Sequence, residues 1–156
     1  MKVAYIAETS LTNKSAYTQH VIKMCDAFSN TTSELILLLP NVDKNFNYRN
    51  LQKKFLLTSK KKFKVHSILG YKVKGFILRS LFSFKAANYL RLKKIDLILT
   101  RSFITSFFLS LFKIKHFLEI HSELTSLTKF IMINLNFINS KYIIKIILIS
   151  NIIIYR

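Results

Sequence analysis

Three polar side chains alternate in one short stretch of the sequence, FLEIHSE, which ends at Glu123. Glu119, His121 and Glu123 are each two positions apart, so on a β-strand they would all point to one face. Carboxylates and an imidazole on one face are ligand types of a metal site, and they are also common groups in acid and base catalysis. The chemistry that they could perform depends on whether they lie buried inside a strand or exposed at the end of that strand, at the edge of the sheet.

The elements that must position this stretch are short apolar runs separated by segments with a helical period. Runs without strict alternation predict strands that are covered on both faces. Strands are predicted at residues 2–7, 34–40, 62–68, 95–100, 116–120 and 142–150, and helices at residues 15–28, 48–55, 73–92, 102–112 and 124–138. Ser15 is a plausible N-cap of the first helix, and the helix at 73–92 is marked by Val73, Ile77, Leu81 and Phe84. This alternation predicts one α/β domain over residues 1–156, a Rossmann-like open parallel sheet with helices on both faces.

Polar side chains follow the predicted strands at their carboxyl ends, which is where open parallel sheets bind ligands. Glu119 lies inside its apolar run, so we expect a partly buried acid that needs a hydrogen-bond donor, and no metal is predicted. An Arg, a His and a Glu along one rim predict a ligand site. The rim residues are Glu8, Thr9 and Ser10 after the first strand, Thr100, Arg101 and Ser102 after the strand at 95–100, and His121, Ser122 and Glu123 after the strand at 116–120.

Several cofactor and enzyme classes are disfavoured by motifs that the sequence lacks. The first loop, ETSLTNKSAY, contains no glycine, so it has no G-x-G-x-x-G pattern for a dinucleotide. The sequence has neither a P-loop nor a G-x-S-x-G elbow. Cys25 is the single cysteine, which excludes an internal disulfide and a multi-cysteine zinc site. No cofactor is predicted.

The net charge of +18 leaves alternatives open for the partner. A basic surface attracts the phosphates of nucleic acid or of anionic lipid, but a chain rich in Lys, Ile, Asn and Phe is also typical of an AT-rich genome. The aromatic residues are mostly Phe at core spacing rather than interleaved with the basic runs, which disfavours nucleic acid. The N-terminus has no signal-peptide pattern, and Lys141 and Lys145 break the apolar C-terminal third into two expected buried elements. We expect a cytoplasmic protein, with an anionic membrane surface on the inner face of the cell membrane as a candidate partner.

Four segments, in order, resemble one enzyme family. MKVAYIAET followed by SAYTQHVIKMCDAF resembles the opening strand, loop and first helix of bacterial group 1 (family 4-like) glycosyltransferases of the two-domain GT-B type. DLILTRS resembles the segment in which those enzymes read Asp, three apolar residues, Thr or Ser, and Arg. HFLEIHSE resembles their strand that ends in Glu, an apolar residue and His, and IIKIILISN resembles a later strand. The resemblance covers nearly the whole chain.

The resemblance implies sugar transfer from a nucleotide-sugar donor, as co-substrate, to a surface polysaccharide or a lipid-linked glycan acceptor. It implies that this domain is the N-terminal, acceptor-side half, and that the donor-binding C-terminal domain is absent, so we expect no activity from the chain alone. A separate chain would supply that half. By the same resemblance, His121 is the catalytic residue at the sugar, while Thr9, Ser10, Lys14 and Ser15 lie beside the donor diphosphate. Arg101, Ser102 and Glu123 would contact substrate. The alternative is a basic module that binds nucleic acid or an anionic membrane without catalysis.

Overall fold

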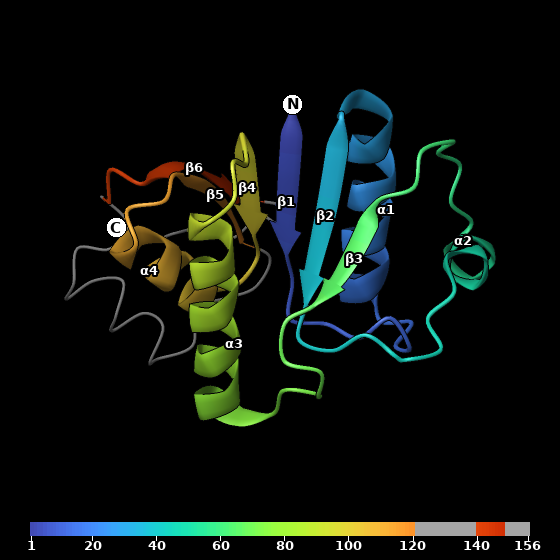
Figure 1. The fold of residues 1–156 in the computed structure, drawn as a ribbon, viewed down its shortest axis with the longest axis horizontal. Helices are drawn as coiled ribbons and strands as arrows, with labels where there is room; N and C mark the ends of the chain where they lie inside the picture. The colour runs from blue at the N-terminus through green and yellow to red at the C-terminus, as the bar shows by residue number, and fades with distance from the viewer. Residues whose placement is uncertain (121–139, 149–156) are drawn as a thin grey trace.

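The computed structural model describes residues 1–120 and 140–148 (Figure 1). Strands and helices alternate as the apolar runs predict, up to the fifth strand. The strands are β1 (Lys2–Ile6), β2 (Glu34–Leu39), β3 (Lys64–Ser67), β4 (Leu97–Thr100), β5 (His116–Ile120) and β6 (Ile143–Leu148), and the helices are α1 (Ala16–Thr31), α2 (Tyr48–Phe55), α3 (Gly75–Arg91) and α4 (Phe103–Leu111). The helix predicted at 124–138 lies outside the described residues.

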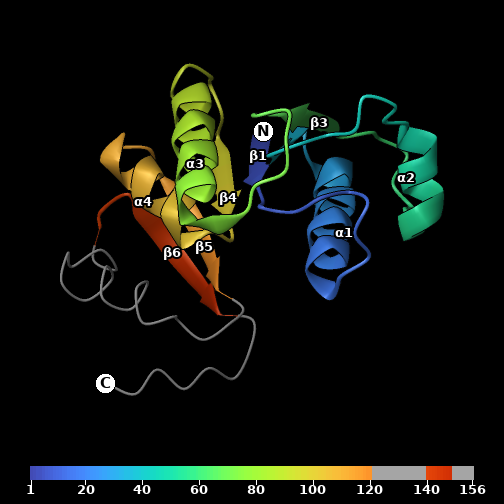
Figure 2. The ribbon, with the colours of Figure 1, turned by 90° about the horizontal axis from the view of Figure 1, so that it is seen from below.

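The strands form one open parallel sheet in the order β3-β2-β1-β4-β5-β6. β1 lies between β2 and β4, so the strand order reverses at β1, and the loops after β1 and β4 leave the same edge. Helices α1 and α2 pack on one face, and α3 and α4 pack on the other (Figure 2). The predicted α/β class, a Rossmann-like parallel sheet with helices on both faces, is confirmed.

The core has two halves because alternate residues of β1 point to opposite faces of the sheet. Val3 and Tyr5 pack with α1 and α2, while Ala4 and Ile6 pack with α3 and α4. All four side chains are fully buried. The carboxyl end of β1 is therefore held between the two layers.

Two helix starts carry side-chain caps that also fix the loops of the carboxyl edge. Ser15 Oγ accepts a hydrogen bond from the backbone N–H of Thr18, which confirms Ser15 as the N-cap of α1. Ser102 Oγ accepts from the N–H of Thr105 in the same way and begins α4 directly after β4. Each cap pairs a donor that the first helical turn leaves without an intrahelical partner.

The apolar face of α3 differs from the prediction. Ile77 is 81% exposed and Phe84 is 44% exposed, so the stripe expected to mark this helix lies largely on its outer side. The side that packs on the sheet uses Phe82 and the small residues Ala86 and Ala87. Small side chains let the helix axis approach the sheet closely. Because both sides of the helix carry apolar residues, the sequence pattern does not indicate which side packs on the sheet.

The strand β6 corrects the expectation of a buried strand at 142–150, while the other expected element, at 124–138, lies outside the described residues. Ile144 is 53% exposed and Lys145 is exposed, because β6 pairs only with β5 and lies at the edge of the described sheet. An edge strand with an exposed Lys is protected from pairing with another chain. Among the described residues, no helix combines the length and the apolar character that crossing a bilayer requires.

Candidate functional site

The carboxyl edge of the sheet gathers polar side chains from β1, β4, β5 and α1. Parallel strands all deliver their following residues to one edge, and the N-termini of α1, α3 and α4 begin there as well (Figure 1). The order of the strands reverses between β1 and β4, and at such a point the two loops diverge and leave room for a ligand. The candidate site therefore lies at this edge.

Glu119 is the buried acid of this edge, and its partners come from three different elements. Its side chain is 2% exposed. The Tyr5 hydroxyl donates a hydrogen bond to Glu119 Oε2 at 2.7 Å, and His20 Nε2 on α1 lies 2.8 Å from Glu119 Oε1. Arg101 Nε, after β4, lies 3.6 Å from the same oxygen. The expectation of a buried acid that needs a donor is confirmed, and the acid belongs to an ionic network rather than to a row of ligands.

Arg101 is a cation of this network whose donors are not all used by the described residues. Its side chain is 4% exposed, and its guanidinium carbon lies 4.4 Å from the centre of the Tyr17 ring. Neither Nε nor Nη1 of Arg101 makes a hydrogen bond with any residue of the described segments. Buried donors are nearly always paired in native proteins, so free donors at a ligand edge favour an oxygen-rich ligand.

Glu8 is held from both sides of the edge. Ser102 Oγ donates to Glu8 Oε1, and Arg79 Nε, on α3, donates to Glu8 Oε2. The Glu8 side chain is 8% exposed, and its backbone N–H donates to the Tyr17 hydroxyl at 3.3 Å. A carboxylate has about four lone-pair sites, so Glu8 keeps capacity to accept from hydroxyl groups of a ligand.

Both phenols of the site are neutral hydrogen-bonding groups. Burial raises the pKa of Tyr17 to about 12, although the nearby Arg101 opposes that rise. Burial, and next the charge of Glu119, raises the pKa of Tyr5 far above its ordinary value. Tyr5 is therefore a fixed proton donor to Glu119 and does not titrate in the physiological range.

The first loop lies at the edge, and its hydroxyls are mostly engaged in local structure. Thr9 Oγ1 pairs with Thr18 Oγ1, Ser10 Oγ pairs with Thr12 Oγ1 at 2.8 Å, and Ser15 caps α1. The Lys14 side chain is exposed, and its carbonyl accepts from Gln19. Contact of Thr9, Ser10, Lys14 and Ser15 with a ligand stays a prediction, as it does for Arg101 and Ser102.

His121 and Glu123, predicted as catalytic and substrate-binding residues, lie outside the described residues. Within the described segments, no three His, Cys, Asp or Glu side chains group in a way that could hold a metal ion. Of the remaining histidines, His116 is fully buried and bonds Ser106 Oγ at 2.6 Å and the Ile114 carbonyl at 2.9 Å. His116 is therefore structural, whereas His20 is part of the edge.

Four residues of the edge were not predicted from the sequence. Tyr5 lies inside the strand predicted at 2–7, and Tyr17 and His20 lie inside the helix predicted at 15–28. Arg79 lies in a helix that is marked only by its apolar residues. No local pattern joins them, since Tyr5 and Glu119 are 114 positions apart. The sequence does offer one indication, which is the position of Glu119 inside an apolar strand. A buried acid needs a hydrogen-bond donor, so a donor must exist elsewhere in the chain.

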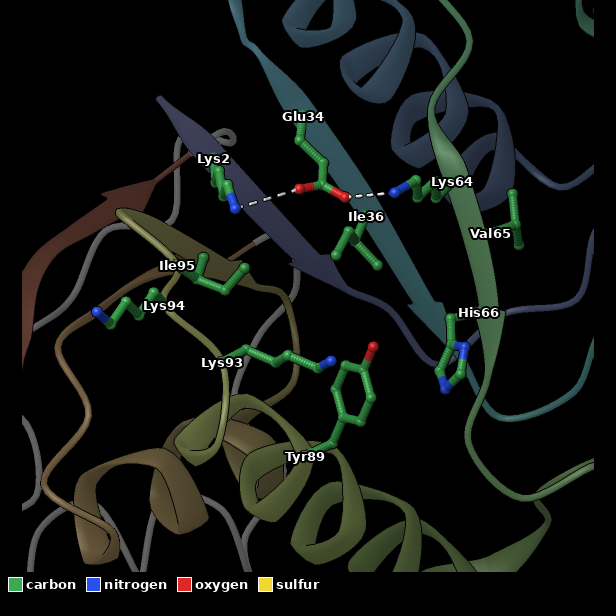
Figure 3. Close-up of a pocket in the computed structure, with 10 residues that line it drawn as sticks. All are labelled: Lys2, Glu34, Ile36, Lys64, Val65, His66, Tyr89, Lys93, Lys94 and Ile95. Atoms are coloured by element: carbon green, nitrogen blue, oxygen red, sulfur yellow. Dashed lines mark hydrogen bonds and ion pairs between the residues drawn. The ribbon is translucent and has the colours of Figure 1, made fainter.

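A basic groove of about 500 Å³ lies at the opposite, amino edge of the sheet (Figure 3). Its only acid, Glu34, pairs with Lys64 at 2.6 Å and with Lys2 at 3.7 Å, so two of its cations share one carboxylate. The Tyr89 ring stacks on His66 with centroids 4.8 Å apart. Open parallel sheets bind ligands at the carboxyl edge, so we place the candidate site there and not in this groove.

Comparison of the chain with protein-family models, curated proteins and solved structures found no match. The interpretation of the carboxyl edge therefore depends on its geometry and on the resemblance in the four segments. The arrangement combines a buried cation with free donors, a carboxylate fixed by two donors, and a loop rich in hydroxyls. Such an edge can bind a polar, hydroxyl-rich or anionic ligand.

Proposed function

We propose that this domain is the acceptor-side part of a glycosyltransferase, which transfers a sugar from a nucleotide-sugar donor to a surface polysaccharide or a lipid-linked glycan. The observation that carries the proposal is the contact between Arg101 and Glu119 at 3.6 Å. These two residues come from DLILTRS and HFLEIHSE, two of the segments that resemble the family, and they meet beside the first loop. The segments that the resemblance selects from sequence thus converge on one edge.

The chemistry of the edge suits a sugar acceptor. A sugar offers hydroxyl groups that both donate and accept, and Glu8 can accept from them while Arg101 can donate to them. The apolar ring of Tyr17 lies beneath the guanidinium, so Arg101 is held in place and little side-chain entropy is lost on binding. Charge-assisted hydrogen bonds of this kind contribute about 1.5–3 kcal/mol each.

The transfer step itself needs groups beyond the described edge. A closed site must exclude water and hold the donor diphosphate while the acceptor hydroxyl attacks the sugar. In the family that the chain resembles, a second domain binds the donor. We therefore assign acceptor binding to this edge and expect the isolated chain to bind glycans without turnover.

The test is direct binding of soluble glycans to the purified chain. A glycan array followed by calorimetry should identify oligosaccharides that bind the wild-type protein. Arg101→Lys keeps the charge but removes the planar set of donors, and it should weaken that binding by roughly tenfold or more. Lys94→Gln, on the opposite edge, is the matched control and should bind as the wild type does.

Three results would overturn the proposal. The first is that no glycan binds the wild-type protein. The second is that Arg101→Lys leaves glycan binding unchanged while its circular dichroism spectrum matches that of the wild type. The third is sustained turnover of a labelled nucleotide sugar by the isolated chain, which would refute the assignment of this domain to the acceptor side alone.

A further inference from the structure

A protruding tip of the molecule exposes apolar side chains together with cations. We call residues 71–77 the α3 tip, which comprises the loop before α3 and the first residues of that helix. Ile77 is 81% exposed, Phe76 is 52% exposed and Tyr71 is 44% exposed. In Figure 1 this loop and the first turn of α3 lie beyond the arrowheads of β1, β2 and β3. Three large apolar side chains that face solvent at one tip are not explained by the core.

The backbone of the α3 tip is built to protrude. Gly70 and Gly75 adopt positive φ angles of 80° and 74°, and a Cβ added at either position would meet nothing within 4 Å. The chain therefore turns twice in open space before α3 begins, which requires conformations that glycine adopts without strain. Val73 packs against the core and anchors the tip, whereas the other residues of 71–77 are exposed to solvent.

The charged side chains within the α3 tip are all cations. Lys72 and Lys74 are exposed within it, and the first turn of α3 carries no acidic residue. The sequence between Asp43 and Asp96 contains no Asp or Glu, so its permanently charged side chains are all Lys or Arg. The surface around the exposed apolar residues is thus complementary to a negatively charged partner.

We infer that the α3 tip attaches this domain to an anionic lipid bilayer, with Phe76 and Ile77 inserted at the headgroup boundary and Lys72 and Lys74 on the lipid phosphates. Ile77 is the most exposed large apolar side chain of the described residues. An aliphatic side chain neither stacks on a base nor binds a phosphate, but it partitions into a bilayer interface. A two-fold contact with a second copy would bring a second set of the same cations against this surface.

Attachment through the α3 tip would turn the candidate site toward the bilayer. Arg79, which follows the tip on α3, donates to Glu8 at the carboxyl edge. The tip and the site therefore share one edge of the molecule, and a glycan on a lipid carrier would be presented next to Glu8 and Arg101. In this respect the inference rests on the proposed function, although attachment itself does not require it.

Vesicle flotation tests the inference with lipids that carry no glycan. Vesicles of phosphatidylcholine mixed with phosphatidylglycerol should carry the full chain at physiological salt, and vesicles of phosphatidylcholine alone should carry much less. Ile77→Ser should weaken binding to the anionic vesicles by roughly tenfold, because burial of a large aliphatic side chain is lost. Lys72→Gln and Lys74→Gln should each weaken it by about fivefold, the factor that corresponds to about 1 kcal/mol per cation.

Matched controls come from the other end of α3, at the amino edge. Leu92 is 74% exposed and is followed by Lys93 and Lys94, so it offers the same chemistry in another place. Leu92→Ser and Lys93→Gln should float as the wild type does. All these positions are exposed, so an unchanged circular dichroism spectrum is expected for each variant.

Four outcomes would overturn the inference. They are failure of the wild type to bind anionic vesicles, full binding by Ile77→Ser, an equal loss in Leu92→Ser, and release from vesicles by millimolar inorganic phosphate or by RNA. The last would identify a phosphate or nucleic-acid site instead of a bilayer site. Failure of vesicle binding would leave soluble-glycan binding untouched, so the two proposals fail separately.

Discussion

The Glu119→Gln substitution removes a buried negative charge while it keeps the size of the side chain. Glu119 is 2% exposed, and Arg101, whose Nε lies 3.6 Å away, is 4% exposed. Removal of one partner from a buried ion pair leaves the other charge uncompensated and typically costs about 3–5 kcal/mol. We therefore expect Glu119→Gln to lower the free energy of unfolding by about 4 kcal/mol.

Urea unfolding followed by far-ultraviolet circular dichroism measures this loss, since the chain contains no Trp. The free energy of unfolding of a small domain falls by about 2 kcal/mol per M of urea, so the expected loss lowers the urea midpoint by about 2 M. Glu34→Gln makes the same chemical change at the amino edge, where the partner Lys64 is 72% exposed. That control should leave the midpoint close to the wild-type value, because solvent screens an exposed pair.

The double variant decides whether Arg101 is the group left uncompensated. If it is, Arg101→Met in the Glu119→Gln background should cost less than it does alone, with a coupling energy of about 1–3 kcal/mol. Single losses that add to within about 0.5 kcal/mol would refute the coupling. An unchanged midpoint for Glu119→Gln alone would refute the whole account of the edge.

Three further predictions concern residues elsewhere in the described fold. Ser15→Ala should lower the free energy of unfolding by about 1 kcal/mol in urea titrations. Ser102→Ala should lower it more, because Ser102 caps a helix and also donates to Glu8. Equal losses in the two variants would contradict the bond to Glu8 as a second role. Burial raises the pKa of the Cys25 thiol, so a thiol reagent should label Cys25 only after unfolding, and labelling of the native protein at the rate of a free thiol would contradict the buried position. Burial lowers the pKa of His116 below 6.5, so the unfolded chain takes up this proton first and the free energy of unfolding should fall as the pH drops below that value. Urea titrations between pH ~7.5 and pH ~5 should show this slope in the wild type, and a slope that survives His116→Asn would assign it to another group.

Much of the fold could be predicted from sequence because a parallel sheet gives a strong local signal. Strands buried on both faces appear as apolar runs, and the predicted run at 116–120 coincides with β5. Ser15 was recognisable as an N-cap because a hydroxyl residue directly before an amphipathic segment can pair a free backbone donor. Such features depend on neighbours in the chain, which a sequence displays directly.

The packing of α3 and the partners of Glu119 could not be predicted, because both depend on distant residues. GFILRSLFSFKAANYLR has apolar residues around its whole circumference, so only the neighbouring sheet decides that Ala86 is buried and Ile77 is exposed. The position of Glu119 indicated that a donor must exist. That the donors are Tyr5, His20 and Arg101 follows from the order β1-β4-β5 and the position of α1, which no spacing in the sequence reveals.

The network around Glu119 also has a consequence for the order in which the chain can fold. A ribosome releases β1, α1 and β4 before β5, so Tyr5, His20 and Arg101 exist for a time without their common acceptor. In a nascent sheet of the first four strands, β4 would be an unpaired edge strand, and the three side chains would lack the acceptor that fixes them in the complete fold. Addition of Glu119 pairs all three side chains in one step. Folding of this domain is therefore expected to wait for β5 and to occur as one cooperative event, with the early strands remaining accessible to chaperones until residue 119 has left the ribosome.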